Sequence, residues 1–407
     1  MPNQFMRLAL RLAARGYGAT SPNPMVGAVL VKGGKIIGRG WHHRAGGPHA
    51  EIEALRDAER RGNDVRGATL YVSLEPCSTH GRTPPCTEAL IKSGVGRVVV
   101  AATDPNPAHA GRGFTLLKRA GISVEKGLLA EMAARLNEAF NHWIVHRTPF
   151  VVVKAAMTLD GKIATARGES KWITGPEARA AGMRLRLGTD AVLVGINTVL
   201  ADNPSLTWRP GKGSSTRGKA PEREVVRHPL RRIVLDAEAR TPLKAKVVSD
   251  AQAGSTIIVV SDAAPKSRVE WLSKRVTVWR APLKPGKRGT QRGGELPPRL
   301  DLVWLLKRLG RENITSLLVE GGGEVNGSFL LQGLAHRVAF FYAPKILGGR
   351  DARKAVAGDG AASMEEILNL TEIEWKQLGE DWLFTARVTR QGKPRQRVSR
   401  RKGARRR

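Results

Sequence analysis

The stretch Cys77-Ser-Thr-His-Gly-Arg-Thr-Pro-Pro-Cys86 contains both cysteines of this 407-residue chain. His49 and Glu51 lie upstream in the order His-Ala-Glu, and Glu75-Pro76 directly precede the first cysteine. One imidazole and two thiolates supply three ligands to a zinc ion and leave the fourth tetrahedral position open for water. The stretch therefore predicts a catalytic rather than a closed structural zinc site, with His49, Cys77 and Cys86 as ligands.

Glu51 is expected to carry the proton chemistry of this site. A His-x-Glu pair followed by Pro-Cys and a second cysteine is the signature of a zinc-dependent deaminase. Zinc lowers the pKa of water, so that hydroxide is available near neutral pH. If a helix begins at this point, its first turn brings His49 to the metal and Glu51 to the water. Glu51 then transfers a proton from the water to the departing ammonia.

Two simpler interpretations of the cysteines stay open. Many zinc deaminases have two residues between the cysteines, whereas this chain has eight, 78–85. Lone cysteines are often just small buried hydrophobic residues, but then His-x-Glu and Glu-Pro-Cys would both be accidental. A disulfide is disfavoured because no signal peptide directs the chain to an oxidising compartment.

The longer spacing resembles a known family. Glu75-Pro-Cys-Ser-Thr-His-Gly-Arg-Thr-Pro-Pro-Cys86 is similar to the deaminase half of the bifunctional riboflavin-biosynthesis deaminase/reductase. Three further stretches agree: Ser21-Pro-Asn-Pro-Met-Val-Gly-Ala28, Gly40-Trp-His-His-Arg-Ala-Gly-Gly-Pro-His-Ala-Glu51, and Asp104-Pro-Asn-Pro107 with Gly111-Arg-Gly113. The first looks like that family's substrate loop. The resemblance covers residues 4 to about 387 and implies that Asn23 and His42 hold the pyrimidine or its phosphate.

Composition fits a globular protein of two domains. The hydrophobic fraction is 41%, and a chain of this length buries a sizeable core. No apolar run approaches the roughly 18 to 20 residues that cross a membrane. Residues 4–15 place Arg and Leu on different faces and resemble a targeting peptide. We interpret them as a first helix, because the expected substrate loop follows at once, and we expect a cytoplasmic enzyme.

The formal charge of +32 is high for an enzyme that acts on small molecules. Residues 390–407 contain ten Lys and Arg and no Asp or Glu, which leaves about +22 for the rest. Residues 208–232 and 282–299 are also basic, and all three segments lack apolar periodicity, so we interpret them as two loops and a disordered tail. Such charge favours weak, non-specific adhesion to nucleic acid. The alternative, a compositional bias without any partner, is preferred over specific recognition.

Alternating helices and strands divide the chain into two α/β domains. In residues 1–146 we expect a three-layer α/β/α, cytidine-deaminase-like domain. Its predicted strands are 25–31, 35–40, 68–73 and 97–102, and its helices are 4–15, 50–61, 87–93, 113–120 and 130–146. In residues 149–388 we expect a second domain, with strands at 150–156, 191–195, 232–236, 256–261 and 316–320. Residues 389–407 form the tail.

A glycine run, Gly321-Gly-Gly-Glu-Val-Asn-Gly327, follows the last of these strands. A strand, a glycine run and a helix start can hold a phosphate on backbone N–H groups. The run is weak evidence alone, because glycine-rich turns are common and the chain lacks the G-x-G-x-x-G fingerprint.

The second half resembles the reductase domain of the same enzyme. The matching stretches are Lys154-x-Ala-x-Thr-Leu-Asp-Gly-Lys162, Glu169-Ser-Lys-Trp-Ile-Thr174, Thr198 to Arg209 and Glu320-Gly-Gly-Gly. The resemblance implies a dihydrofolate-reductase-like fold with NADPH as hydride donor. The implied cofactor-binding residues are Ala156, Trp172, Thr198, Asp202, Gly322, Gly323, Glu324, Val325, Asn326, Gly327 and Ser328. The implied substrate-binding residues are Ser170, Arg186, Leu206, Arg209 and Glu320.

Several reductase positions are less firmly assigned. Arg186 and Arg209 suit the substrate's 5′-phosphate, because a guanidinium pairs bidentately with phosphate oxygens. Lys154 and Asp160 are candidate proton or hydrogen-bond partners. Ala237 departs from the family, which often has a small hydroxyl there, so one cofactor contact is in doubt.

The resemblance implies two reactions in sequence on one phosphorylated pyrimidine. Zinc-dependent hydrolysis removes the 2-amino group of 2,5-diamino-6-ribosylamino-4(3H)-pyrimidinone 5′-phosphate, and NADPH then reduces the ribosyl group to ribityl. It also implies a homo-oligomer. One alternative is a nucleic-acid deaminase that acts on a flipped base, but such an enzyme would have no use for the second half of this chain. The other is a non-catalytic RNA-binding protein on an inactive scaffold. The presence of all three zinc ligands and of Glu51 argues against it.

Overall fold

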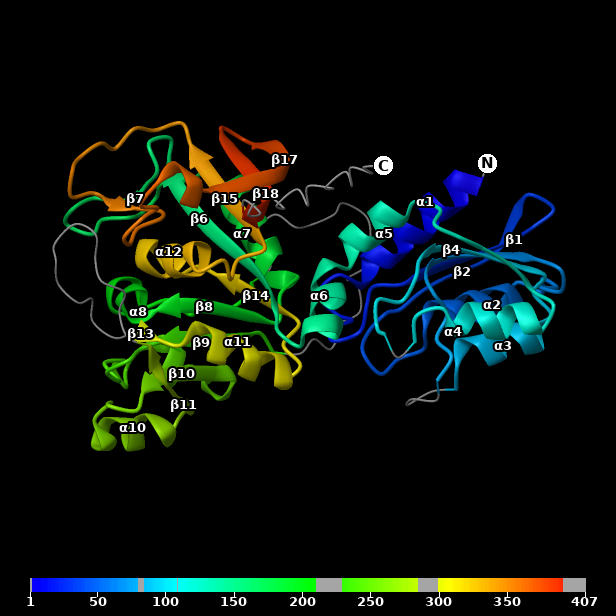
Figure 1. Cartoon of the computed structure of the whole chain (residues 1–407), viewed down its shortest axis with the longest axis horizontal. Coiled ribbons are helices and arrows are strands. Elements are labelled where there is room, and N and C mark those ends of the chain that lie inside the picture. Colours follow the sequence, from blue (N-terminus) through cyan, green and yellow to red (C-terminus); the bar gives the residue numbers. More distant parts are fainter. Residues whose placement is uncertain (1, 80–83, 108, 210–228, 285–298, 391–407) are drawn as a thin grey trace, which may run out of the picture.

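The structure is a computed structural model, and it describes residues 2–79, 84–107, 109–209, 229–284 and 299–390. The chain forms two α/β halves, each built around its own large sheet (Figure 1). Most of the three basic segments, 208–232, 282–299 and 389–407, lies outside the described residues.

The N-terminal half is a five-stranded mixed sheet in the order β2-β1-β3-β4-β5. Its strands are β1 (Gly27–Lys32), β2 (Lys35–Trp41), β3 (Thr69–Leu74), β4 (Arg97–Ala102) and β5 (Ser123–Lys126). The hairpin β1–β2 and the pair β1–β3 are antiparallel, while β3, β4 and β5 run parallel. Parallel strands lie with their carboxyl ends at one edge, so residues that follow β3 and β4 lie close together.

Helices cover both faces of this sheet, as predicted. One face packs on α2 (Ala50–Arg60), α3 (Cys86–Ser93) and α4 (Arg112–Arg119), and the other on α1 (Pro2–Ala13) and α5 (Ala130–Leu136). The three-layer α/β/α arrangement is confirmed. A short 3-10 turn, Ala14–Gly16, follows α1.

The helix predicted at 130–146 is two helices, α5 and α6 (Glu138–His146), which meet at Asn137. Asn137 has φ −113° and ψ 26°, outside the helical range. Its buried side-chain amide bonds twice to Met25, since Oδ1 accepts from Met25 N at 2.8 Å and Nδ2 donates to Met25 O at 2.9 Å. Periodicity could not predict this break, because a contact with a distant segment causes it.

The C-terminal half is a nine-stranded sheet in the order β11-β10-β9-β8-β14-β6-β15-β18-β17. Its strands are β6 (Phe150–Thr158), β8 (Ala191–Gly195), β9 (Arg231–Leu235), β10 (Thr256–Ser261), β11 (Thr277–Ala281), β14 (Ser316–Val319), β15 (Arg337–Ala343), β17 (Leu368–Leu378) and β18 (Asp381–Arg390). All neighbours from β11 to β15 pair in parallel, and β18 and β17 add an antiparallel edge. Four short strands pair outside it: β7 (Lys162–Ala164) with β16 (Arg353–Lys354), and β12 (Leu283–Lys284) with β13 (Arg299–Leu300).

Helices again cover the sheet. One face packs on α11 (Leu302–Arg311) and α12 (Gly323–Leu331), and the other on α8 (Ile196–Asp202), α9 (Lys246–Ser249) and α10 (Lys266–Ser273). Helix α7 (Pro176–Leu187) packs on β15 and β18 through Phe341 and Leu383. No helix in the described part of the chain is long and apolar enough to span a membrane.

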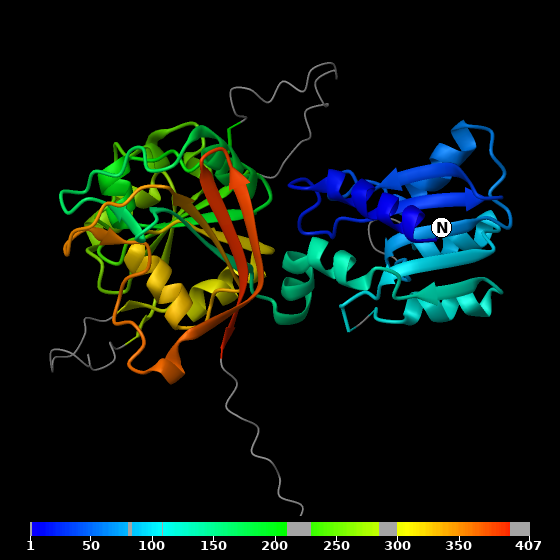
Figure 2. The ribbon, with the colours of Figure 1, turned by 90° about the horizontal axis from the view of Figure 1, so that it is seen from above.

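Helix α6 lies between the two halves in both ribbon views (Figure 1, Figure 2). Its Trp143 is buried and donates from Nε1 to the carbonyl of Gly310 at 2.9 Å. Its first residue, Glu138, forms a bidentate pair with Arg337 of β15, at 2.7 and 2.9 Å, and also pairs with Arg387 of β18. The α6 helix is therefore packed against the second sheet, although the preceding residue, Asn137, bonds to the first half.

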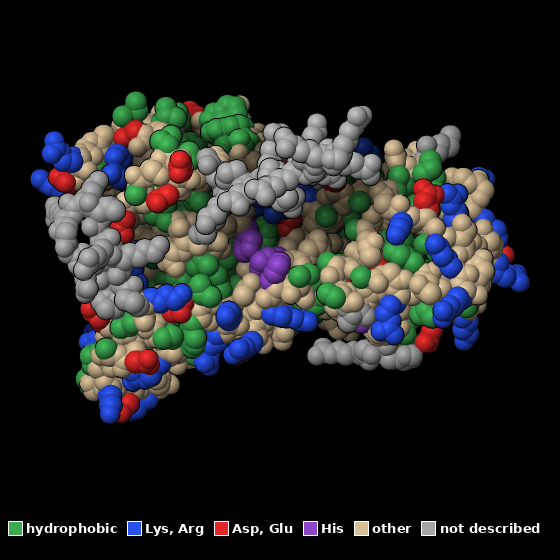
Figure 3. All heavy atoms as spheres, in the orientation of Figure 1, with side chains coloured by type: hydrophobic (Ala, Val, Ile, Leu, Met, Phe, Trp, Pro, Cys, Tyr) green, Lys and Arg blue, Asp and Glu red, His purple; other side chains and the backbone are tan. Residues whose placement is uncertain are grey.

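Histidines gather near the middle of one face of the molecule (Figure 3). The ring centroids of His142 and His146 on α6 lie 4.7 Å apart, and the His142 ring lies 4.1 Å from that of His336, the residue before β15. His336 Nδ1 accepts a hydrogen bond from Val151 N at 2.9 Å, which requires an unprotonated Nδ1. Burial, with Arg387 and His146 nearby, lowers the pKa of His336 from 6.5 to about 4. The imidazole is therefore neutral in the folded chain near pH 7.

This histidine predicts a loss of stability in mild acid. Between pH 6.5 and about 4 the unfolded chain binds a proton at His336 that the folded chain does not. Its contribution, on the order of 3 kcal/mol, is complete above pH 6.5 and declines as the pH falls through that window. Thermal unfolding at pH 7.5 and 5.5 measures the effect. His336→Asn keeps an acceptor for Val151 N without titrating, so its midpoint should fall less; an equal fall in both proteins contradicts the prediction.

Candidate active sites

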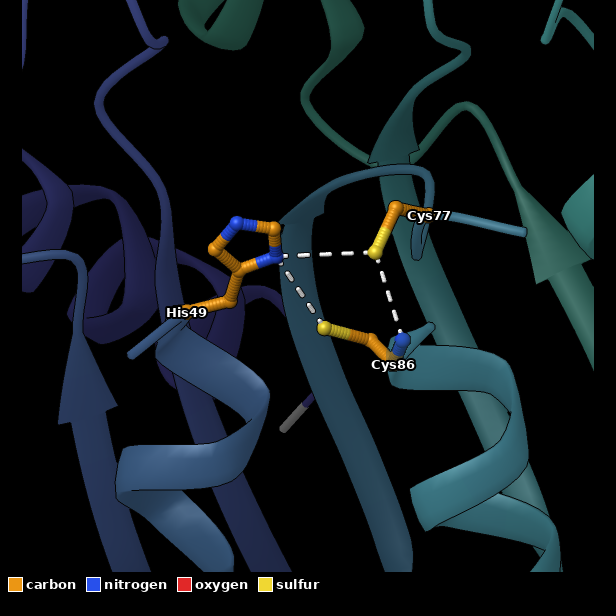
Figure 4. A group of neighbouring side chains, drawn as sticks. All are labelled: His49, Cys77 and Cys86. Atoms are coloured by element: carbon orange, nitrogen blue, oxygen red, sulfur yellow. Dashed lines mark hydrogen bonds between the residues drawn. The ribbon is translucent and has the colours of Figure 1, made fainter. Parts of the chain in front are cut away.

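Three side chains converge as the sequence predicts (Figure 4). His49 Nδ1 lies 3.3 Å from Cys86 Sγ and 3.5 Å from Cys77 Sγ. All three ligand atoms lie within 4.8 Å of one another. Both thiols are free, so the structure does not support the disulfide alternative.

The spacing fits zinc. Tetrahedral bonds of about 2.0–2.1 Å to nitrogen and about 2.3 Å to sulfur place these donors about 3.6 Å apart. The observed separations of 3.3 and 3.5 Å are close to that value. Two soft thiolates and an imidazole are also the donor set that zinc prefers over calcium or magnesium. The three residues can therefore hold a zinc ion with little rearrangement.

Each ligand lies at the end of a regular element, which fixes its direction. His49 is the residue before α2, Cys77 lies three residues after β3, and Cys86 is the first residue of α3. The backbone N–H of Cys86 donates to Cys77 Sγ at 3.2 Å. A hydrogen bond from the Cys86 thiol, helped by His49 and by this backbone N–H, lowers the pKa of Cys77 to about 4, whereas donating the thiol proton, together with burial, raises the pKa of Cys86. A helix N-terminus also favours negative charge, so the arrangement is prepared for a thiolate.

Glu51 lies on the first turn of α2 beside these ligands and is only 3% exposed. Burial, with a further contribution from Cys77, raises the pKa of Glu51 from 4.5 to about 7. A carboxyl group with a pKa near neutrality can both accept and release a proton during turnover. The structure thus places the predicted acid–base group next to the predicted metal centre.

Asn23 and His42 lie next to the metal centre. Asn23 Nδ2 donates to His42 Nε2 at 3.1 Å, and His42 Nδ1 donates to the carbonyl of Pro48 at 2.9 Å. The His42 ring meets the His49 ring edge-on at 5.4 Å. His42 is 2% exposed, whereas Asn23 is half-buried. Because both ring nitrogens of His42 are used, its observed role is to orient Asn23.

Glu75 organises the neighbouring loop, a role that sequence analysis missed. Its carboxylate accepts from the backbone N–H groups of Asp104 at 3.2 Å, Gly111 at 3.0 Å and Gly113 at 3.0 Å. A Cβ on Gly113 would lie 2.4 Å from the carbonyl of Pro76, so only glycine fits there. The sequence carries a signal for this role, since Glu75 immediately precedes Pro76-Cys77 and residues 104–113 resemble an active-site loop of the family.

In the second half, Glu320 lies just past the carboxyl end of β14 and binds two cations. Its carboxylate pairs bidentately with Arg186, at 2.8 and 3.0 Å, and lies 3.6 Å from Lys154 Nζ. Burial alone would raise the pKa of Glu320, but Lys154 and Arg186 together lower it to about 2. Arg186 also donates to the carbonyl of Thr207 at 3.1 Å. The structure therefore brings Glu320, Arg186 and the segment next to Leu206 together. The guanidinium of Arg186 is already paired with the carboxylate of Glu320.

The predicted phosphate loop is largely a helix, which corrects its expected conformation. Residues 323–331 form α12, and Asn326 and Gly327 are buried in it. A Cβ on Gly327 would lie 1.8 Å from the carbonyl of Ala357, so this glycine permits close packing of the backbones. Gly322, with φ 77°, precedes the helix, and a Cβ there would lie 3.8 Å from Thr198 Oγ1. Gly322, the residue before the helix, therefore lies close to Thr198, and the role of both at the cofactor stays a prediction.

The remaining predicted reductase residues differ in exposure. Trp172 is 68% exposed and lies under the guanidinium of Arg179, whereas Leu206 is 2% exposed. Asp202 and Arg209 are exposed, and Ser170 and Ala156 are half-buried. Their roles stay predictions.

Asp160 accepts hydrogen bonds from Thr158 Oγ1 at 2.6 Å, Gly348 N at 2.8 Å and Leu347 N at 3.1 Å. These bonds tie the turn after β6 to the segment after β15. They give Asp160 a structural role, and its predicted part in the reaction stays a prediction.

The fold and the metal centre define a zinc-dependent pyrimidine deaminase joined to a reductase. Residues 1–102 match the family described as the cytidine and deoxycytidylate deaminase zinc-binding region, and residues 149–384 match the RibD C-terminal domain. The chain belongs to the RibD family of bifunctional riboflavin-biosynthesis proteins. Its halves are a deaminase and a reductase, with zinc and NADPH as cofactors.

Relatives match along nearly their whole length. Identity is 42% to the riboflavin biosynthesis protein RibD of Actinobacillus pleuropneumoniae, covering 93% of each chain, and 41% to that of Aquifex aeolicus, covering 93% and 96%. Among solved structures, Acinetobacter baumannii RibD aligns with a TM-score of 0.80 at 36% identity, covering 96% of this chain and 99% of that one. A diaminohydroxyphosphoribosylaminopyrimidine deaminase/5-amino-6-(5-phosphoribosylamino)uracil reductase from Thermotoga maritima aligns at 0.74 and 34%, covering 95% and 99%. The resemblance identified from the motifs is confirmed.

Proposed function

We propose that the chain deaminates 2,5-diamino-6-ribosylamino-4(3H)-pyrimidinone 5′-phosphate and then reduces the ribosyl side chain, giving 5-amino-6-(5-phosphoribitylamino)uracil. The observation that carries the first step is the convergence of His49, Cys77 and Cys86 beside the buried Glu51. The name of the Thermotoga maritima relative, a deaminase of the diaminopyrimidine and a reductase of the resulting aminouracil, supports the substrate and the order of the two steps.

In the deaminase site, His49, Cys77 and Cys86 hold the zinc ion. When bound, zinc makes water acidic enough to serve as the nucleophile near neutral pH. Glu51 accepts a proton from that water and delivers it to the departing amino group, which leaves as ammonia. Asn23, oriented by His42, donates a hydrogen bond to the pyrimidine or its phosphate.

In the reductase site, bound NADPH would be the source of the hydride that reduces C1′ of the opened, imine form of the sugar. Thr198, Asp202, Ala156, Trp172 and the segment 322–328 bind the cofactor. Glu320, Ser170, Leu206, Arg186 and Arg209 bind the substrate, with Arg209 the exposed cation for its phosphate. The protein's contribution is to align the two reactants, because proximity alone removes much of the barrier.

We further propose domains at 1–146 and 149–388 with a basic tail at 389–407, a cytoplasmic location and a homo-oligomer. The free thiols support a reducing compartment. The edge strand β17 supports self-association, because Ile373 and Trp375 on it, and Trp382 on β18, are 53%, 56% and 43% exposed. Exposed apolar edges of this kind favour pairing with another sheet.

A coupled assay on zinc-verified protein tests the function. With the diaminopyrimidinone ribotide as sole substrate, ammonia should appear first and NADPH oxidation should follow. Ammonia without NADPH oxidation would limit the activity to the first half. Neither signal from protein with one zinc per chain would instead favour the nucleic-acid deaminase.

The basic tail is proposed to cause only non-specific adhesion to nucleic acid. Deleting 392–407 removes nine cationic residues, so retention on immobilised RNA should fall at low salt, where phosphate contacts dominate. Both reactions should be unchanged. A deletion that inactivates either reaction contradicts this proposal.

A further inference from the structure

Residues of the reductase half contact the loop that carries Asn23. Tyr17, three residues before Thr20, donates from its hydroxyl to the carbonyl of Arg184 at 3.2 Å. Its ring fills the space beside Gly188, where a Cβ would lie 1.9 Å from the ring carbon that bears the hydroxyl. The chain just before the loop is thus fitted against the end of α7, which belongs to the other half.

A second contact lies within the loop. Ser21 Oγ lies 3.3 Å from Thr315 Oγ1, immediately before β14. Thr315 donates its hydroxyl proton to Asp190 Oδ2 at 2.7 Å, so it must accept from Ser21. Asp190 also accepts the backbone N–H of Thr315 at 2.7 Å. The acceptor that Ser21 meets is therefore held rigidly by the second sheet.

The far end of the loop is fixed at Met25, whose N–H and C=O both bond to the side chain of Asn137. The next residue, Glu138, is paired with Arg337 and Arg387 of the second sheet. These three contacts of residues 17–25 therefore depend, directly or through α6, on the reductase half, while the deaminase half adds the bond from Asn23 to His42 and the bond from Ala45 N to the carbonyl of Ala19.

Building on the proposed function, we infer that the reductase half is a structural part of the deaminase's substrate site: Tyr17, Ser21 and Asn137 position the loop 20–25 so that Asn23 meets the substrate. The zinc ligands and Glu51 come from α2, α3 and the end of β3, which these contacts do not touch. Loss of a contact should therefore weaken substrate binding and leave the chemical step intact. Holding a binding group in its bound geometry improves affinity because less ordering remains to be done on binding.

Gly188→Ala tests the inference from the opposite half. Gly188 has φ −91° and ψ 11°, which alanine adopts easily, and the three atoms nearest to the new methyl group all belong to the Tyr17 side chain. In the full-length, zinc-loaded protein we expect the KM for ammonia release to rise about tenfold with kcat within about twofold. Zinc content should not change. Gly254→Ala is the matched control, since a Cβ there meets nothing within 4 Å, and its KM should equal that of the wild type.

Adding Tyr17→Ala to the Gly188→Ala variant removes the ring with which the introduced methyl group collides. The KM of the double variant should match that of Tyr17→Ala alone, because the two residues act through one contact. The inference is overturned if wild type releases ammonia and Gly188→Ala does so with an unchanged KM, or if the two effects simply add. If wild type loaded with zinc releases no ammonia, the proposed function itself fails.

Discussion

Glu51→Gln is expected to abolish ammonia release while the protein keeps one zinc per chain. Glutamine has the same shape but cannot take a proton from water or return one to the leaving amine. General acid–base catalysis contributes about 10² to 10⁴ in rate, and Glu51 serves both transfers, so we expect a loss of at least about 10³. Ammonia release, zinc content and NADPH oxidation on pre-deaminated substrate are measured together, and the last two should equal the wild type.

Glu53→Gln is the matched control on the same turn of α2. Glu53 lies two positions, about 200° around the helix, from Glu51 and pairs with Arg56 at 3.3 Å, so its loss should leave deamination unchanged. Persistent ammonia release by Glu51→Gln would assign the proton transfers to another group. Loss of NADPH oxidation as well would show that the two reactions do not have separate sites.

Glu320→Gln is expected to impair the reductase more than any other single change in that half. It leaves Arg186 and Lys154 facing a neutral amide in a buried site, and removal of one partner from a buried ion pair costs about 3–5 kcal/mol. Arg186 also holds the carbonyl of Thr207, so the segment next to Leu206 should shift. We expect NADPH oxidation on pre-deaminated substrate to fall at least about 10²-fold, with a lower unfolding midpoint.

Deamination, zinc content and the exposed Glu312→Gln provide the controls for this change. Glu312 lies at the end of α11 on the surface of the same half, so its variant should match the wild type. A Glu320→Gln protein that is less stable yet reduces its substrate at the normal rate would restrict Glu320 to a structural role.

The metal centre was predictable because its ligands and its acid–base group all occur in short sequence motifs. His49, Glu51, Cys77 and Cys86 each occur within a short recognisable stretch, and the apolar strands beside them have lengths typical of a covered sheet. The ranges of β4, β8 and β10 were predicted to the residue because each is a short, continuous apolar run of this kind.

What the sequence could not predict depends on contacts between distant segments. Asn137 interrupts a periodic helix because its amide bonds to Met25, more than a hundred residues earlier. Glycines of α12 look like a phosphate loop, yet Gly327 serves close packing against Ala357. Periodicity and composition record none of these partners.

The adjacent residues Asn137 and Glu138 also decide where this chain can be divided. A fragment that ends at residue 146 retains α6 but loses the surface that buries Trp143 and the arginines that neutralise Glu138. A fragment that begins at residue 149 lacks α6, so the surface of the second half on which α6 packs becomes exposed. Expression of either half alone therefore exposes the apolar surface and the unpaired charges of this contact. A working split protein must leave α6 with the second half and supply another partner for Met25.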